Sequence, residues 1–242
     1  MKPKLTFLLA LTFLFLFSGF VYGEEEVKRE YWDNGKLKSE THYKNGKKDG
    51  LETSHYPKSG KKYFEIHWKN GKREGLQTHW HENGKKYIET HWKNGKEEGL
   101  STSWYESGKK EIEDHYKNGK REGVDTHWYE NGKKFTEKHW KNGQLEGLKT
   151  WWHESGKKYF ETPYKNGKRE GLETWWFESG EKKGESHYKD GKKDGLTTTW
   201  YKNSKKRHTK HFKNGIENGI RKEWDENGKL TFEGNFVDGV QR

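Results

Sequence analysis

The chain lacks several residue types that folded proteins normally use. It contains no cysteine, one methionine and three prolines in 242 residues, and its single alanine is Ala10. Without cysteine there is no disulfide framework and no lipid-attachment site. Alanine is the strongest helix former, so its absence from the rest of the chain, together with abundant Thr, Trp and Tyr, favours strands over helices.

Aliphatic side chains are also scarce. Residues 24–242 contain 25 Leu, Ile, Val and Phe residues, a number low enough by itself to predict disorder. The same residues include 32 Trp, Tyr and Phe, however, whereas disordered chains are poor in aromatic residues. They also carry 47 Lys and Arg against 38 Asp and Glu, a net charge of +9. We therefore expect a basic, folded chain without a thick apolar core.

The first 23 residues have a composition of their own. Lys2 and Lys4 precede an apolar run over residues 5–17, and Val21-Tyr22-Gly23 leads into three glutamates. A basic start, a short apolar run and small residues before a polar border are typical of a secretory signal peptide. The run is short for a transmembrane helix, and an uncleaved membrane anchor is the alternative. We expect export and cleavage near Gly23, which gives a secreted, periplasmic or cell-surface protein.

The rest of the chain repeats one unit of 24 residues. Its pattern is aromatic-Lys-Asn-Gly-Lys-x-Glu-Gly-Leu-x-Thr-x-Trp-x-Glu-(Asn or Ser)-Gly-Lys-Lys-x-x-Glu-x-His. A half-repeat or cap covers residues 24–42, and a partial repeat covers residues 236–242. Between them, residues 43–235 form eight repeats, the first with one extra residue, most simply Pro57: 43–67, 68–91, 92–115, 116–139, 140–163, 164–187, 188–211 and 212–235.

Each repeat contains two turn signals, which divide it into two strands. The first is Asn-Gly or Asp-Gly, as at 70–71, and the second is Asn-Gly or Ser-Gly, as at 83–84. Asn-Gly between short aromatic runs favours a hairpin with a type I′ turn, in which both residues have positive φ. Strands of about six residues, roughly 17 in all, then pair with their sequence neighbours. The sequence predicts an all-β fold, an elongated single-layer antiparallel β-meander of repeated hairpins.

Strand alternation predicts which side chains share a face of this sheet. Pairing across the turn at 83–84 gives three cross-strand pairs on one face: Leu76 with His91, Thr78 with Glu89 and Trp80 with Tyr87. The opposite face then carries three other residues: His79, Ile88 and Trp92. A bulge at the repeated Gly75 would move Trp92 to the Trp80 face. We favour this bulge, because one aromatic face and one Lys/Glu face suit a sheet in water.

The Asn-Gly-Lys-x-x-Gly turn followed by an apolar residue and an aromatic strand recurs through the chain: 45–51, 70–76, 94–100, 118–124, 142–148, 166–172, 190–196 and 214–220. This pattern resembles the MORN repeat (membrane occupation and recognition nexus), in the bacterial variant known as the YwqK antitoxin-like family. The resemblance covers almost all of residues 24–242. It implies a curved sheet of hairpins that serves as a binding or scaffolding surface, with no catalytic residues to carry over. The repeat here is slightly longer than usual, and an export signal fits poorly with a cytoplasmic antitoxin.

The histidines and carboxylates do not single out a catalytic or metal site. One slot of the repeat holds a row of histidines: His42, His67, His91, His115, His139, His187 and His211. Neighbours in this row would lie roughly 9.6 Å apart, too far to share one zinc ion easily. We interpret them as copied strand residues, with weak metal binding or a pH response as the alternative. Every repeat offers the same glutamates, such as Glu74 and Glu82, which we assign to turn stabilisation and lysine pairing. We predict no enzyme, no cofactor and no metal.

The aromatic residues form two rows. One is Trp80, Trp104, Trp128, Trp152, Trp176, Trp200 and Trp224, and the other includes Trp68, Trp92, Tyr116 and Trp140. Building the core is one explanation of both rows, but a single-layer sheet leaves Trp partly exposed, and exposed apolar rows mark interaction surfaces. Trp151 and Trp175 stand at an otherwise polar position. We expect them to face solvent, away from the first row, and to contact a partner rather than stabilise the fold.

Lysines line both ends of the predicted strands, including Lys133, Lys134, Lys157 and Lys158. They keep the chain soluble and protect strand edges, or they attract a polyanion. The predicted partner-binding residues are therefore Trp80, Trp104, Trp128, Trp151, Trp152, Trp175, Trp176, Lys133, Lys134, Lys157 and Lys158.

Two functions fit these features. The first is an exported, non-catalytic binding or scaffold surface for an envelope or host-surface partner, which is a glycan, an anionic polymer or a protein. The second is a purely structural or protein-assembly repeat, or an antitoxin-like or immunity-like partner of another protein. An anionic membrane surface is a further candidate partner, whereas export makes nucleic acid a poor one.

Overall fold

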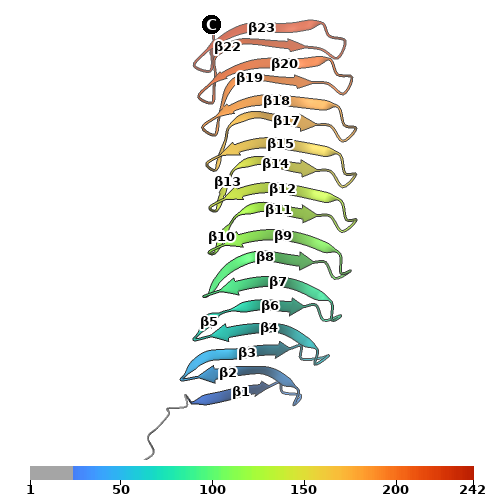
Figure 1. Ribbon diagram of the computed structural model, residues 1–242. Coiled ribbons are helices and arrows are strands. Elements are labelled where there is room, and N and C mark those ends of the chain that lie inside the picture. The colour runs from blue at the N-terminus through green and yellow to red at the C-terminus, as the bar shows by residue number, and fades with distance from the viewer. Residues whose placement is uncertain (1–23) are drawn as a thin grey trace, which may run out of the picture.

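The computed structural model describes residues 24–242, and all the regular elements in that range are β-strands (Figure 1). The predicted signal peptide lies outside the described residues. In chain order the strands are β1 (Glu25–Tyr31), β2 (Leu37–Lys44), β3 (Lys47–His55), β4 (Lys62–Lys69), β5 (Lys72–Arg73), β6 (Gly75–Trp80), β7 (Lys86–Lys93), β8 (Lys96–Trp104), β9 (Lys110–Lys117), β10 (Lys120–Arg121), β11 (Gly123–Trp128), β12 (Lys134–Lys141), β13 (Gln144–Leu145), β14 (Gly147–Trp152), β15 (Lys158–Lys165), β16 (Lys168–Arg169), β17 (Gly171–Trp176), β18 (Lys182–Lys189), β19 (Lys192–Trp200), β20 (Lys206–Lys213), β21 (Ile216–Glu217), β22 (Gly219–Trp224), β23 (Leu230–Val237) and β24 (Val240–Gln241).

These strands form one open, antiparallel, 24-stranded sheet. The long strands pair with their sequence neighbours, from β1 with β2 at one end to β22 with β23 at the other, and Figure 1 shows them stacked in chain order. Six of the 24 are two-residue strands next to the first turn: β5, β10, β13, β16, β21 and β24. The other 18 compare with the roughly 17 predicted. The single-layer meander predicted from the sequence is confirmed.

The sheet has almost no apolar interior. Among the described residues, the buried hydrophobic side chains are Ile66 and Phe236, whereas many buried side chains are threonines and serines. Threonine suits this place because it is β-branched and favours strands. As expected, the chain folds without a thick apolar core.

The first turn of each repeat matches the prediction. In the second repeat, Asn70 has φ 50° and Gly71 has φ 77°, as a type I′ turn requires. The turn also carries contacts between repeats: the amide of Gly95 donates to the carbonyl of Arg73 at 2.9 Å, and the amide of Asn94 donates to Glu74 Oε2 at 2.7 Å. The glutamates of this slot therefore stabilise turns, as predicted.

The second turn differs from the prediction. Gly84 has φ 90°, but Asn83 is absent from the residues with positive φ, so the turn is not type I′. The loop is longer, since the amide of Gly84 donates to the carbonyl of His81 and the amide of His81 donates to the carbonyl of Lys85, both at 2.9 Å. Asn83 has a different role here, because its Oδ1 accepts from the Lys85 amide and its Nδ2 donates to the carbonyl of Glu106 in the next repeat.

The expected face shift at Gly75 does not occur. Trp68 pairs with Arg73 and Glu65 pairs with Thr78, so two extra residues, Glu74 and Gly75, lie opposite β4. An insertion of two residues preserves the alternation of side chains. The preference for Trp92 on the Trp80 face is therefore wrong, because these residues lie on opposite faces.

The strand pairing that was predicted across the second turn is confirmed except next to the turn. Leu76 pairs with His91 and Thr78 with Glu89, as predicted, but Trp80 pairs with Lys86 rather than Tyr87. A bulge at this end of the hairpin takes up Tyr87. The histidine row also finds a structural partner, since Nδ1 of His67, His91, His115, His139, His187 and His211 bonds a backbone carbonyl nine residues ahead.

Candidate binding surface

The two faces of the sheet differ in how strictly they repeat. We define the repeated face as the one that carries Trp80, and the variable face as the one that carries Trp92. On the repeated face, the position of Thr78 is threonine in seven of the eight repeats, and the positions of Trp80 and Glu89 are equally uniform. On the variable face, the equivalent row of positions changes from repeat to repeat: Glu52, Gln77, Ser101, Asp125, Lys149, Glu173, Thr197 and Arg221.

The repeated face satisfies its own charges and rings. Lys134 forms an ion pair with Glu137, and its Nζ lies 5.6 Å from the centre of the Trp152 ring in the next repeat. Lys158 likewise forms an ion pair with Glu161, and its Nζ lies 5.7 Å from the centre of the Trp176 ring. Five of the predicted binding tryptophans are covered by lysines in this way: Trp80 by Lys62, Trp104 by Lys86, Trp128 by Lys110, Trp152 by Lys134 and Trp176 by Lys158. These contacts explain the row as part of the fold.

Two other predicted lysines hold the second turns together. Lys133 Nζ donates to the carbonyl of Ser155 at 2.7 Å, and Lys157 Nζ donates to the carbonyl of Ser179 at 2.6 Å. Both contacts link one repeat to the next. The exposed lysines of this end of the sheet are thus part of an inter-repeat ladder.

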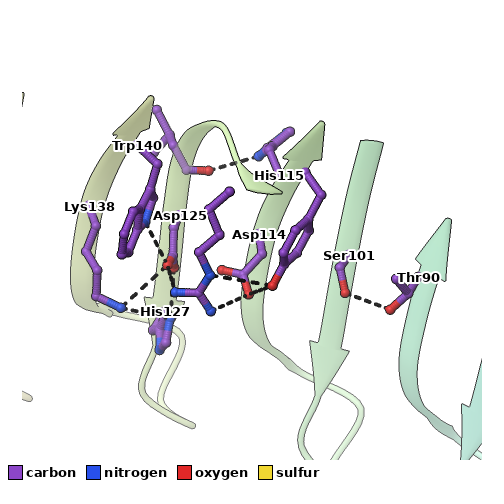
Figure 2. Close-up of polar contacts among 11 residues, drawn as sticks. Thr90, Ser101, Asp114, His115, Asp125, His127, Lys138 and Trp140 are labelled. Carbon is purple, nitrogen blue, oxygen red and sulfur yellow. Dashed lines mark hydrogen bonds and ion pairs between the residues drawn. The ribbon is translucent and has the colours of Figure 1, made fainter. Parts of the chain in front are cut away.

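The variable face has a polar centre. We define its centre row by residues that follow one another across the strands: Thr41, Glu52, Ile66, Gln77, Thr90, Ser101, Asp114, Asp125, Lys138, Lys149, Thr162, Glu173, Ser186, Thr197, Lys210 and Arg221. Several neighbours in this row bond one another. Thr90 and Ser101 share a hydroxyl hydrogen bond of 2.8 Å (Figure 2), and Thr162 donates to Glu173 at 2.9 Å. Several members are fully buried, so a polar ladder lies where a core would be.

An ionic cluster occupies the middle of this row (Figure 2). The side chain of Asp125 is only 1% exposed. Its carboxylate accepts from Arg121 at 3.0 Å and from the Trp140 indole at 3.2 Å, and lies 3.5 Å from Lys138 Nζ. Other contacts complete the cluster: His127 Nε2 lies 2.8 Å from Asp125, and Arg121 bridges to Asp114 at 3.2 Å.

The two carboxyl groups of the cluster have opposite pKa shifts. Burial and the neighbouring Asp125 raise the pKa of Asp114 to about 6. Burial also opposes ionisation of Asp125, but hydrogen bonds from His127 and Asp114, and the charge of Lys138, hold the pKa of Asp125 below its usual range. Asp114, Asp125 and His127 lie close enough to share a cation. Because Arg121 and Lys138 already balance the carboxylates, we assign the cluster to the fold.

Trp151 and Trp175 lie on the variable face, on the side away from Trp152 and Trp176, as alternation predicts. They are not free in solvent, however. Trp151 packs on Phe160 with ring centres 5.1 Å apart, and Phe160 lies 6.1 Å from Trp175. Lys149 Nζ lies 4.0 Å from the Trp151 ring. The expectation that both rings face solvent holds in part: they are partly exposed, and they form a half-buried aromatic cluster with Phe160.

Sequence reasoning missed a hollow on the same face, beside this cluster. It has a volume of about 600 Å³, and its lining includes Phe177, Lys183, Tyr201 and Arg207. The available signal was a departure from the repeat: positions 183 and 207 hold Lys and Arg where other repeats hold Tyr63, Tyr87, Phe135 and Tyr159.

The comparisons with known proteins agree with this repeat architecture. The family described as MORN repeat variant matches seven segments that together cover more than half of the chain: 27–45, 73–94, 97–118, 121–142, 145–166, 169–190 and 217–238. A search among curated proteins found no match. Over residues 24–242 there is also no helix with the length and apolar character that a membrane crossing requires.

Proposed function

Because the chain belongs to the MORN repeat variant family, we propose that it is a non-catalytic scaffold that binds an extended partner along the variable face of its sheet. We further propose export, with the partner being a glycan, an anionic polymer or a protein of the cell envelope or a host surface. The narrower resemblance, to the YwqK antitoxin-like variant, remains a prediction.

One observation carries this proposal. Both faces belong to the same hairpins, yet most positions of the repeated face are copied through the repeats, while on the variable face the aromatic row of Trp68 and Trp92 is kept and the positions of Gln77, His79 and Ile88 change. The copied set, such as Thr150, Glu161 and Lys158, forms the contacts that any repeat of this fold needs. Residues that differ between otherwise identical repeats give each segment its own chemistry. Variation concentrated on one face therefore supports specific recognition on that face.

The aromatic cluster provides the contact area for such recognition. Trp151, Phe160 and Trp175 lie on three neighbouring strands, β14, β15 and β17, and are half-buried. Large aromatic rings of this kind dominate the energetics of binding surfaces. We expect the partner to contact this cluster.

A binding screen with face-specific variants tests the proposal. Residues 24–242 would be screened against envelope polysaccharides, anionic lipid vesicles and surface proteins, with tryptophan fluorescence as the readout. We expect Trp151→Ala with Trp175→Ala to weaken binding by about tenfold or more, as loss of central aromatic contacts does. The matched pair Lys134→Ala with Lys158→Ala alters the repeated face and should change binding by less than about threefold. Melting curves separate lost binding from lost folding, and binding lost only in the lysine pair would overturn the proposal.

Export has its own test. Mass spectrometry of the secreted or periplasmic fraction should find an N-terminus at or close to Glu24. Membrane-bound protein that retains Met1 would contradict export.

A further inference from the structure

We propose that the hollow between β17 and β20 on the variable face is a binding site for an acidic saccharide, a sugar chain that carries carboxylate or sulfate groups. This inference rests on the proposed function and names the place and the class of ligand.

The hollow lies where two consecutive repeats have a cation in place of an aromatic ring at the second turn. In four other repeats, a ring at this position packs on a ring of the turn, with centres about 5 Å apart: Tyr56 with Tyr63 at 5.1 Å, His81 with Tyr87 at 5.0 Å, Tyr129 with Phe135 at 5.0 Å and His153 with Tyr159 at 4.9 Å. In the sixth and seventh repeats the second ring is replaced by Lys183 and Arg207, whereas the third and eighth repeats have Glu111 and Thr231 at this position. Each cation now lies beside a single ring, Lys183 at 5.7 Å from Phe177 and Arg207 at 5.8 Å from Tyr201.

A small residue of the lining, Thr199, stands where Trp151 and Trp175 do. Gly184, which pairs with Thr199, stands where other repeats have Ile88 or Phe160. Trp175 leans over Gly184, so closely that a Cβ on this glycine would lie 2.7 Å from the indole. The hollow thus begins where the aromatic cluster ends, and the two form one continuous strip of the variable face.

The charges around the hollow favour an anion. Lys183, Arg207 and Lys202 line it, against one carboxylate, Glu226. Among the ion pairs of residues 24–242, none involves Lys183 or Arg207. His208, also in the lining, adds no charge, since burial and the nearby Lys210 and Arg207 lower its pKa to about 4. Two further carboxylates, Glu223 and Asp225, lie on the side of Arg207 that faces away from the hollow. Glu223 accepts a hydrogen bond from Arg221, which offsets its charge.

Both the rings and the backbone favour a saccharide over an acidic peptide. A sugar ring offers a C–H face that packs on Phe177 or Tyr201, while its acidic group reaches the adjacent cation. Asn203 and Thr199 also line the hollow. Asn203 already bonds the carbonyl of Glu226, and Thr199 bonds His208, so the remaining hydrogen-bonding capacity of these two side chains is open to the sugar hydroxyls. A peptide in extended form binds best by adding to a free strand edge. The strands under the hollow, from β17 to β20, are already paired on both sides.

The two cations also set a spacing. Lys183 lies on β18 and Arg207 on β20, with β19 between them. Strands lie about 4.8 Å apart, so the two backbone positions are separated by about 9.6 Å. A chain that carries acidic groups on successive sugars is able to reach both cations, whereas a single small anion reaches one.

The test uses tetragalacturonate, its methyl ester and a polyaspartate peptide as probes, with residues 24–242 and calorimetry or tryptophan fluorescence as the readout. We expect tetragalacturonate to bind and its uncharged methyl ester to bind at least about tenfold more weakly. Lys183→Tyr with Arg207→Tyr restores the ring found in other repeats, so this variant should keep its melting temperature and lose at least about tenfold in affinity. Lys183→Arg with Arg207→Lys keeps the charges and should keep most of the binding.

Three results would overturn the inference: equal binding of the ester, tighter binding of polyaspartate than of the saccharide, or full affinity in the Tyr pair. The proposed scaffold function and the saccharide site can be told apart by experiment. If a screened partner depends on Trp151 and Trp175 but not on Lys183 and Arg207, the scaffold function stands and the saccharide site falls.

Discussion

At the scale of single residues, this sheet uses polar side chains where most proteins bury aliphatic ones. Thr162 and Ser186 are fully buried, and each bonds a neighbour in the centre row, Glu173 or Thr197. Such bonding is required, because a buried polar group without a partner costs about 1–3 kcal/mol. A row of this kind ties several pairs of strands together through side chains as well as through the backbone.

The pair Asp114 and Asp125 gives the centre row a pH dependence that can be measured. The folded pKa of Asp114 is about 6, against about 3.9 for an unfolded chain. A group whose pKa is raised by folding stabilises the folded state, and this stabilisation is complete when the pH is below the pKa of the unfolded chain. The stabilisation is lost as the pH rises through the pKa of the folded state. The pKa of Asp125 is lowered, so this residue stabilises the folded state near neutral pH. Its stabilisation is lost only when the pH falls below the ordinary pKa of an aspartate.

We therefore predict that Asp114→Asn gains stability relative to the wild type as pH rises from 4 to 7. The expected gain is on the order of 2 kcal/mol, since one pKa unit corresponds to about 1.4 kcal/mol. Chemical denaturation at several pH values measures the difference between the two proteins, in which other titrating groups largely cancel. Ser101→Ala, an uncharged neighbour in the row, should show a constant difference. A constant difference for Asp114→Asn as well would contradict the assignment.

The sequence alone could not place these residues together. The repeat pattern has an unspecified residue at positions 114 and 125, so it says nothing of their chemistry. Their contact depends on the register between β9 and β11, which the two extra residues Glu122 and Gly123 determine. The face of Trp92 could not be predicted for a similar reason. A repeated glycine such as Gly75 is equally consistent with one extra residue in the strand, which moves Trp92 to the other face, and with two, which do not.

At the scale of the hairpin, the sequence predicted strands and turn positions but not every turn type. Both turns of the second repeat contain Asn-Gly, yet Asn70 has positive φ and Asn83 does not. The difference comes from contacts between repeats, because Asn83 bonds the carbonyl of Glu106 and Lys85 bonds that of Ser107. Such contacts lie 22 or 23 residues apart, beyond the reach of a local pattern.

The 24-residue repeat should behave as the structural unit. Removing residues 116–139 joins His115 to Trp140 and restores the sequence of strands and turns, so a shorter folded protein is expected. Removing only residues 116–127 joins two strands of the same direction and should prevent folding of that region. Circular dichroism melts compare the two deletions. Equal melting of both would show that the 24-residue repeat is not the unit of this fold.

At the scale of the whole molecule, the sheet is a linear array in which each repeat contacts only its neighbours. The long strands pair in chain order, and within residues 24–242 Figure 1 shows no strand returning to pack on an earlier one. Contact of this kind makes stability a sum over repeats and the interfaces between them. The sequence predicted this architecture well, because the repeat itself encodes it.

The end repeats have one neighbour each, and this leads to a prediction about local stability. We expect backbone amides of β1 and β23 to exchange with deuterium before those of β11 and β12, because an end repeat loses one interface when it opens while a central repeat loses two. Exposure supports this order, since all seven residues of β1 are exposed, whereas Asp125 and Thr126 of β11 are buried. Hydrogen exchange followed by mass spectrometry of peptides measures the gradient along the chain. In the shortened protein that lacks residues 116–139, the gradient should persist with a shorter protected centre. Uniform protection from β2 to β22 in both proteins would instead mean that the array unfolds as one cooperative unit, and that interfaces between repeats are too strong for ends to open alone.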